Sequence, residues 1–256
     1  MRTIALALLL LPVTALAASS FDGTWKMRAD SLKVSGKADE FAIADGVFTC
    51  TSCDPALKVK ADGTDQKVSG HDYYDSIAVK VIDKNTVEET RKRAGKTIST
   101  VTLTVSADGK TLTGKFIDYN GAKPATASFT QKRVAAGPAG SHAISGGWLQ
   151  SSLSDANDAL STVAYRMTDE GFSMSSNGQS YKAKFDGKEY PVEGDPGKTL
   201  VTLKRIDGGT VVETDSRAGK VTDEVRLAAA KDGKTITVTD KDLIHGQTTT
   251  MTLEKQ

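Results

Sequence analysis

Two cysteines separated by two residues, Cys50 and Cys53, are the side chains of this sequence with the widest choice of chemistry. A redox-active pair with this spacing needs its first cysteine at a helix N-terminus, where the dipole lowers the thiol pKa. Here the pair follows the strand-like residues 47–49 and runs into the turn sequence Asp54-Pro55. Zinc would need two more ligands, and the chain's three histidines are not in paired spacing. We therefore predict a structural disulfide, no metal site and no cofactor.

The most aromatic polar cluster runs from His71 to Asp75 and contains Tyr73 and Tyr74. Tyrosine and histidine combine an apolar body with a polar tip, which suits the mouth of a ligand pocket. A packed loop is the alternative interpretation. A hydrolase would also need a nucleophile, and no Gly-x-Ser-x-Gly turn or phosphate-binding glycine loop occurs. We predict that the chain is not an enzyme, with His71, Tyr73 and Tyr74 as candidate ligand-binding residues.

A glutamate-threonine pair occurs twice, at Glu89-Thr90 and Glu213-Thr214, each time next to valine in a predicted strand. Two carboxylates at matching positions would suit ligand binding inside each domain. The interpretation preferred from the sequence is that both face outward, toward the Arg-Ala-Gly-Lys side of their own hairpin.

The first residues, MRTIALALLLLPVTALA, have a positive start, an apolar run and small residues before Ala17. This pattern predicts a signal peptide over residues 1–17, cleaved near Ala17, and a periplasmic or secreted protein. No other apolar run is long enough to predict a membrane span. Cleavage removes one cation, Arg2, from 33 basic residues and leaves all 32 acidic ones, so the charges balance. A balanced charge argues against nucleic acid as a partner.

The sequence Thr86–Lys96, TVEETRKRAGK, returns 124 residues later as TVVETDSRAGK. The match extends without a gap from Lys60/Lys184 to Asp118/Asp242, with 24 identities in 59 positions. An internal repeat of this length predicts two tandem domains. We place the first repeat at 18–133, a small-residue linker at 134–143 and the second repeat at 144–256.

Both repeats show the pattern of short antiparallel strands. Apolar residues alternate with threonine, as in Val101, Leu103 and Val105, and Asp-Gly turns separate the segments. Only the stretch Leu153–Leu160 suggests a short helix. Eight or nine strands per repeat would expose two edges unless the sheet closes. We predict an all-β fold of two tandem up-and-down antiparallel β-barrels, with β-sandwiches as the alternative.

Each repeat opens with Gly-x-Trp, in Gly23-Thr24-Trp25 and Gly146-Gly147-Trp148. This motif resembles the first strand of lipocalins and fatty-acid-binding proteins. The resemblance implies that Trp25 and Trp148 pack across the closed ends of the barrels, beneath a cation from the last strand. The candidate cations are Lys132, Arg133 and Lys255. Over the whole mature chain, the sequence resembles a group of uncharacterised exported bacterial proteins with two such units.

These features predict a non-catalytic exported module that binds an apolar or amphipathic small molecule. Aromatic residues are fewer in the second repeat, so we expect its barrel to hold the larger cavity, with Tyr165, Phe172 and Phe185 as wall residues. Two alternatives remain open: a structural or interaction protein of the cell envelope with filled barrels, and a thiol–disulfide protein.

Overall fold

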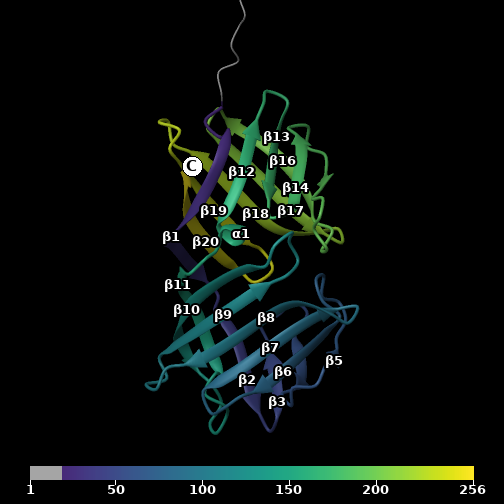
Figure 1. Cartoon of the computed structure of the whole chain (residues 1–256), viewed down its shortest axis with the longest axis vertical. Coiled ribbons are helices and arrows are strands. Elements are labelled where there is room, and N and C mark those ends of the chain that lie inside the picture. Colours follow the sequence, from purple (N-terminus) through teal and green to yellow (C-terminus); the bar gives the residue numbers. More distant parts are fainter. Residues whose placement is uncertain (1–18) are drawn as a thin grey trace, which may run out of the picture.

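The structure is a computed structural model, which describes residues 19–256. The predicted signal peptide at 1–17 and its cleavage near Ala17 lie outside the described residues. The described chain forms two nearly closed antiparallel sheets of ten strands each, stacked one above the other (Figure 1). The predicted all-β fold of two tandem antiparallel barrels is confirmed.

The first barrel has the strand order β4-β3-β2-β11-β10-β9-β8-β7-β6-β5. Its strands, in chain order, are β2 (Asp39–Ala44), β3 (Val47–Cys50), β4 (Leu57–Lys60), β5 (Gln66–Lys67), β6 (Ser76–Val81), β7 (Thr86–Arg93), β8 (Lys96–Val105), β9 (Thr111–Asp118), β10 (Ala125–Ala136) and β11 (Gly146–Ser154). A single bridge between Asp62 and Lys80 joins the two edges of this sheet.

The second barrel has the order β14-β13-β12-β1-β20-β19-β18-β17-β16-β15. Its strands are β1 (Gly23–Gly36), β12 (Thr162–Met167), β13 (Gly171–Ser176), β14 (Gln179–Lys184), β15 (Tyr190–Pro191), β16 (Leu200–Asp207), β17 (Thr210–Arg217), β18 (Lys220–Ala229), β19 (Thr235–Asp242) and β20 (Gln247–Lys255). A bridge between Ser180 and Glu193 joins its edges.

The two barrels exchange their first strands. Strand β1 comes from the first repeat but pairs with β12 and β20 of the second. Strand β11 comes from the second repeat but pairs with β2 and β10 of the first. The connection between β10 and β11, residues 137–145, overlaps the predicted linker. Each barrel is therefore completed by a strand from the other repeat, so the sheets do not coincide with the sequence halves.

Both tryptophans are fully buried at the start of these exchanged strands. Trp148 lies in the first barrel, where the Arg133 guanidinium is 4.1 Å from its ring centroid. Trp25 lies in the second barrel, where the Lys255 ammonium is 5.4 Å from its ring. Each cation is the direct cross-strand partner of its tryptophan. The cation and the ring at each barrel end therefore come from different repeats.

The glycine of each Gly-x-Trp motif makes room for this arrangement. Gly23 has a φ of +136° and Gly146 a φ of +141°, which residues with a side chain rarely adopt. A Cβ at Gly146 would lie 2.6 Å from Arg133 Nη1 and 2.5 Å from the carbonyl oxygen of Ala135. The glycine of the motif thus allows the unusual backbone conformation and also leaves room for the cation to lie over the tryptophan ring.

One short helix, α1 (Asp158–Ser161), lies at the end of the stretch where the sequence suggested one. Asn157 caps it by accepting a hydrogen bond from the Leu160 N–H at 3.2 Å. Its amide also donates to the carbonyl of Pro124 at 2.9 Å, which ties the helix to the start of β10. Within residues 19–256, no helix has the length and apolarity needed to cross a membrane.

Candidate functional site

The predicted wall residues Tyr165, Phe172 and Phe185 belong to the packed core of the second barrel. The rings of Tyr165 and Phe172 are 5.2 Å apart, and Phe21 meets Phe172 edge-on at 5.2 Å. Burial raises the pKa of the Tyr165 hydroxyl. None of the three predicted residues lines any of the three cavities described below. Their contacts are those of core side chains.

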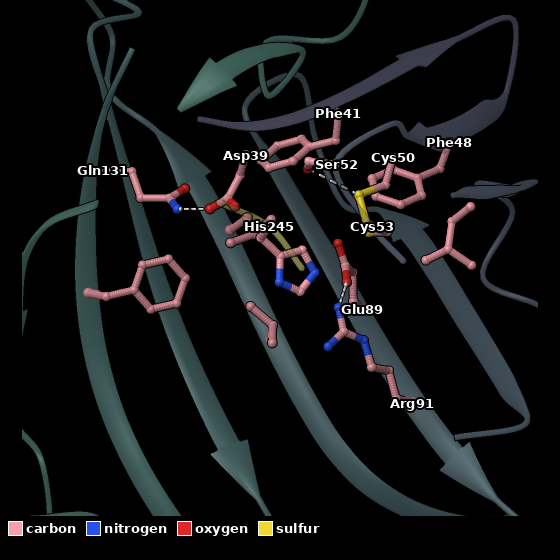
Figure 2. Close-up of a pocket in the computed structure, with 14 residues that line it drawn as sticks. Asp39, Phe41, Phe48, Cys50, Ser52, Cys53, Glu89, Arg91, Gln131 and His245 are labelled. Atoms are coloured by element: carbon pink, nitrogen blue, oxygen red, sulfur yellow. Dashed lines mark hydrogen bonds and ion pairs between the residues drawn. A yellow bond between two sulfur atoms is a disulfide. The ribbon is translucent and has the colours of Figure 1, made fainter. Parts of the chain in front are cut away.

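The first barrel contains a partly open cavity, whereas the sequence led us to expect the larger cavity in the second barrel. Its volume is about 250 Å³. Six apolar side chains line it: Phe41, Phe48, Leu57, Val101, Leu103 and Phe129. Figure 2 shows these residues together with the polar groups at the rim. We call this space the first-barrel cavity.

Substitutions between the repeats explain why the two barrels differ. At the 124-residue offset, Leu57 corresponds to Tyr181 and Gly114 to Val238. Tyr181 is 3% exposed and donates a short hydrogen bond to Glu213, so it fills the space that Leu57 leaves open. In the first barrel, Gly114 lets the ring of Phe129 lie across β9, because a Cβ there would be 2.0 Å from Phe129 Cζ. At these two positions the second barrel is packed where the first is hollow.

The glutamates Glu89 and Glu213 face inward, so the preferred prediction of an outward orientation is wrong. Glu89 is 6% exposed and Glu213 is 9% exposed. The physical reason is the strand alternation itself, which places Glu89 on the same face as the fully buried Val87. Arg91 is the next residue on that face, and its Nη2 lies 3.3 Å from Glu89 Oε2. This ion pair forms one side of the cavity rim (Figure 2).

The other side of the rim is held by Asp39. Its carboxylate accepts hydrogen bonds from Gln131 at 2.7 Å and from Gln247 at 3.1 Å. Burial raises the pKa of Asp39, although these two amides oppose the shift. Gln247 comes from β20, so a residue of the second barrel helps to shape the rim of the first.

His245 is a second contribution from the other barrel. It lies in the turn between β19 and β20, and its ring reaches the first-barrel cavity (Figure 2). Asp242 lies 2.5 Å from His245 Nδ1 and holds the ring in place. A residue in a turn far along the chain gives no sequence signal for this role. The position of Arg91, by contrast, could have been predicted from the sequence, because Val87 and Arg91 are four residues apart in one strand and therefore point to the same face.

The predicted disulfide between Cys50 and Cys53 is present, with the two Cα atoms 5.5 Å apart. Cys50 is the last residue of β3, Cys53 lies in the bend that follows, and no helix begins at either cysteine. Both cysteines line the first-barrel cavity beside Ser52, whose Oγ is 3.6 Å from the Cys50 sulfur. Thus the disulfide closes part of the cavity wall. Among residues 19–256, no three His, Cys, Asp or Glu side chains are arranged to hold a metal ion.

The predicted cluster of His71, Tyr73 and Tyr74 lies where the two barrels meet. Tyr73 and Tyr74 line two further cavities of about 470 Å³ each, and His71 lines one of them. We call the first the inter-barrel chamber; Ile98, Asn120, Met174, Glu213 and Asp215 are among its walls, with Tyr73 and Tyr74. We call the second the side groove; its walls include Asp54, His71, Asp72, Tyr73, Tyr74, Lys220 and His245.

Aromatic and cationic groups alternate in this cluster. The rings of His71 and Tyr74 stack at 4.5 Å. The guanidinium of Arg91 lies 5.2 Å from the Tyr74 centroid, and that of Arg217 lies 5.6 Å from the Tyr73 centroid. Burial, with a further contribution from Arg91, lowers the pKa of His71. A neutral His71 therefore extends the aromatic surface of the groove at neutral pH.

The chamber side of the second barrel carries carboxyl groups close together. Burial raises the pKa of Glu213, and burial together with Glu213 raises that of Asp215 to about 8. Burial raises the pKa of Asp240, on β19, to about 6. At neutral pH Asp215 is therefore mainly protonated, which limits the negative charge at this end of the barrel.

No protein-family model, curated protein or solved structure matches the chain.

Proposed function

We propose that the chain is a non-catalytic, lipocalin-like binding protein, exported to the periplasm or beyond, for an apolar or amphipathic small molecule. The observation that carries this proposal is the first-barrel cavity of about 250 Å³. It combines apolar walls with a few convergent polar groups, which is the usual composition of a small-molecule site.

The polar rim supports an amphipathic ligand over a purely apolar one. Glu89 and Arg91 form an ion pair, and the Asp39 carboxylate accepts hydrogen bonds from two amides. A ligand can therefore bury its apolar part while the charges of Glu89, Arg91 and Asp39 keep their partners within the protein. Its polar part would then lie at the rim, near His245 and the inter-barrel cavities.

A titration with N-phenylnaphthylamine, a neutral dye that fluoresces in apolar surroundings, tests the proposal. We expect saturable fluorescence with the native chain and none with Val101→Phe, because the larger side chain fills the cavity. Val225→Phe is the matched control, since Val225 occupies the equivalent position in the second barrel. Both variants should unfold cooperatively. If the native chain gives no saturable signal, the proposal is wrong.

The filled second barrel favours one alternative function, that of a structural or interaction protein of the cell envelope. Phe21, Trp25, Phe172 and Tyr181 are at most 3% exposed in its core. In that case neither barrel would bind the dye, and the same titration separates the two functions.

A further inference from the structure

His245 is a polar side chain at the rim of the first-barrel cavity, although it comes from the second barrel. It lies in the turn between β19 and β20 and lines both the first-barrel cavity and the side groove. In the view of Figure 2, its ring lies between Asp39 and Glu89. The imidazole therefore stands where the apolar interior of the first barrel opens toward the groove.

The Asp242 carboxylate fixes the orientation of this ring. Its Oδ1 accepts hydrogen bonds from the backbone N–H groups of Ile244 at 2.9 Å and of His245 at 2.7 Å. Its Oδ2 lies 2.5 Å from His245 Nδ1. Because a carboxylate only accepts hydrogen bonds, the proton of the neutral imidazole is on Nδ1. The other ring nitrogen, Nε2, is then a hydrogen-bond acceptor.

This acceptor is open to a ligand. Within residues 19–256, the hydrogen bond of the His245 ring is the one that Nδ1 makes with Asp242, and Nε2 makes none. The side chain is 39% exposed, so the ring is within reach of a molecule in the cavity or the groove. Ligand pockets commonly use a few such polar atoms to orient a ligand that is otherwise held by apolar walls.

The neighbouring charges at the rim already have partners. Glu89 pairs with Arg91 at 3.3 Å, and the Asp39 carboxylate accepts hydrogen bonds from Gln131 and Gln247. A carboxylate head would bring its oxygens against the lone pair of Nε2 and toward these two acidic side chains. A hydroxyl head, by contrast, donates a hydrogen bond to Nε2 and brings no charge into the rim.

We propose that His245 is a specificity-determining residue, whose Nε2 accepts a hydrogen bond from the hydroxyl head of an amphipathic alcohol with its apolar tail in the first-barrel cavity. This inference rests on the proposed function and adds the chemical class of the head group. Asp242 is a positioning residue, because it acts on the ligand through the ring of His245. The apolar walls select the tail, and His245 selects the head.

Calorimetric titration of the full chain with octanol and octyl fluoride tests the inference. Fluorine resembles the hydroxyl group in size and position but carries no proton, so only octanol can donate to Nε2. Because water solvates the two compounds differently, the quantity compared between variants is the ratio of their affinities. The titrations are made at about pH 8, where imidazole side chains are ordinarily neutral.

His245→Phe keeps a ring but removes the acceptor, and should weaken octanol about fivefold relative to octyl fluoride, as expected for one neutral hydrogen bond. His245→Gln supplies a side-chain oxygen in place of Nε2 and should restore part of the native ratio. His142→Phe is the matched control, because His142 lines none of the three cavities and should leave the ratio unchanged. All three variants should unfold cooperatively.

Two charged compounds with the same tail, octanoate and octylammonium, complete the series. We expect both to bind the native chain more weakly than octanol. Tighter binding of octanoate refutes the hydroxyl site and assigns the head to Arg91. Tighter binding of octylammonium also refutes it and assigns the head to the carboxylates of Asp39 and Glu89.

The remaining outcomes separate this inference from the proposed function. If His245→Phe leaves the ratio of octanol to octyl fluoride at its native value, the hydroxyl site is refuted and the binding function stands. If none of the four compounds binds the native chain, both the inference and the proposed function are wrong.

Discussion

The Arg133 guanidinium lies 4.1 Å from the ring centroid of Trp148, although the two residues belong to different sequence repeats. Arg133 Nε donates to the carbonyl of Gly109 at 2.5 Å, and its two terminal nitrogens donate to Ser145 and Ala143 at 2.5 and 2.6 Å. One side chain therefore holds the connection between the repeats against the end of the first barrel. Within residues 19–256, the Lys255 ammonium over Trp25 has no hydrogen bond of this kind.

The first prediction uses this difference between the two barrel ends. Arg133→Met removes three charge-assisted hydrogen bonds and the contact with Trp148, and should lower the free energy of unfolding by about 3 kcal/mol. Lys255→Met removes only the contact with Trp25 and should cost no more than about 1 kcal/mol. Urea unfolding of both variants measures the difference. Equal losses would contradict the assigned role of Arg133.

The second prediction concerns the strand exchange. A protease site inserted between Ala139 and Gly140, both exposed in the connection, allows the chain to be cut between the repeats. Because each barrel contains a strand from the other repeat, the two fragments should stay together on gel filtration and separate only in denaturant. A site in the exposed turn at Gly233, within the second repeat, is a control for cutting efficiency. Separation of the fragments without denaturant would contradict the exchange.

The third prediction is a pH dependence of stability. The pKa of Asp215 is about 8 in the folded chain against 3.8 for the free group, and that of Asp240 is about 6. The unfolded chain loses these protons at lower pH than the folded one. The contribution of these two groups to the stability of the folded chain is therefore fully present below about pH 4. It is lost as the pH rises through about 8.

Urea unfolding at about pH 5 and about pH 9 measures this effect. The native chain should lose stability between the two, and Asp215→Asn should lose less, because asparagine is neutral at both. Arg217 and Asp223 face the same region and remain in the variant. Glu170→Gln, at an exposed position, is the control. An Asp215→Asn variant with the native pH dependence would refute the assignment.

The fourth prediction concerns the disulfide. A bridge between Cys50 and Cys53 closes a very short loop, so replacing both with serine should lower the free energy of unfolding by only about 2 kcal/mol. With no helix to lower a thiol pKa, the native chain should not catalyse insulin reduction. Activity that disappears in Cys50→Ser would instead support the thiol–disulfide alternative.

The fold was predictable because the relevant signals are local. The repeat, the Asp-Gly turns and the alternation in Val101, Leu103 and Val105 together led to antiparallel barrels. The strand exchange was not predictable. The strands that begin at Gly23 and Gly146 carry the same motif, so either fits either barrel by local chemistry, and the choice depends on the connections between them.

The site was only partly predictable, for a similar reason. His71, Tyr73 and Tyr74 stood out by composition, and the phase of Val87 could have placed Glu89 and Arg91 inside the barrel. We predicted the larger cavity in the second barrel because its repeat contains fewer aromatic residues. That count does not consider which residues face the inside of the barrel. His245 enters the site from a turn of the other repeat, and only the packing of one barrel on the other brings it there.

We propose that one barrel of the two holds a ligand. Diffraction from crystals soaked with bromodecanol, recorded at the bromine absorption edge, tests this directly. The predicted result is one bromine site per chain, among Phe48, Leu57 and Leu103 of the first barrel, with none inside the second. A bromine site inside the second barrel, or none in the first, would contradict the account.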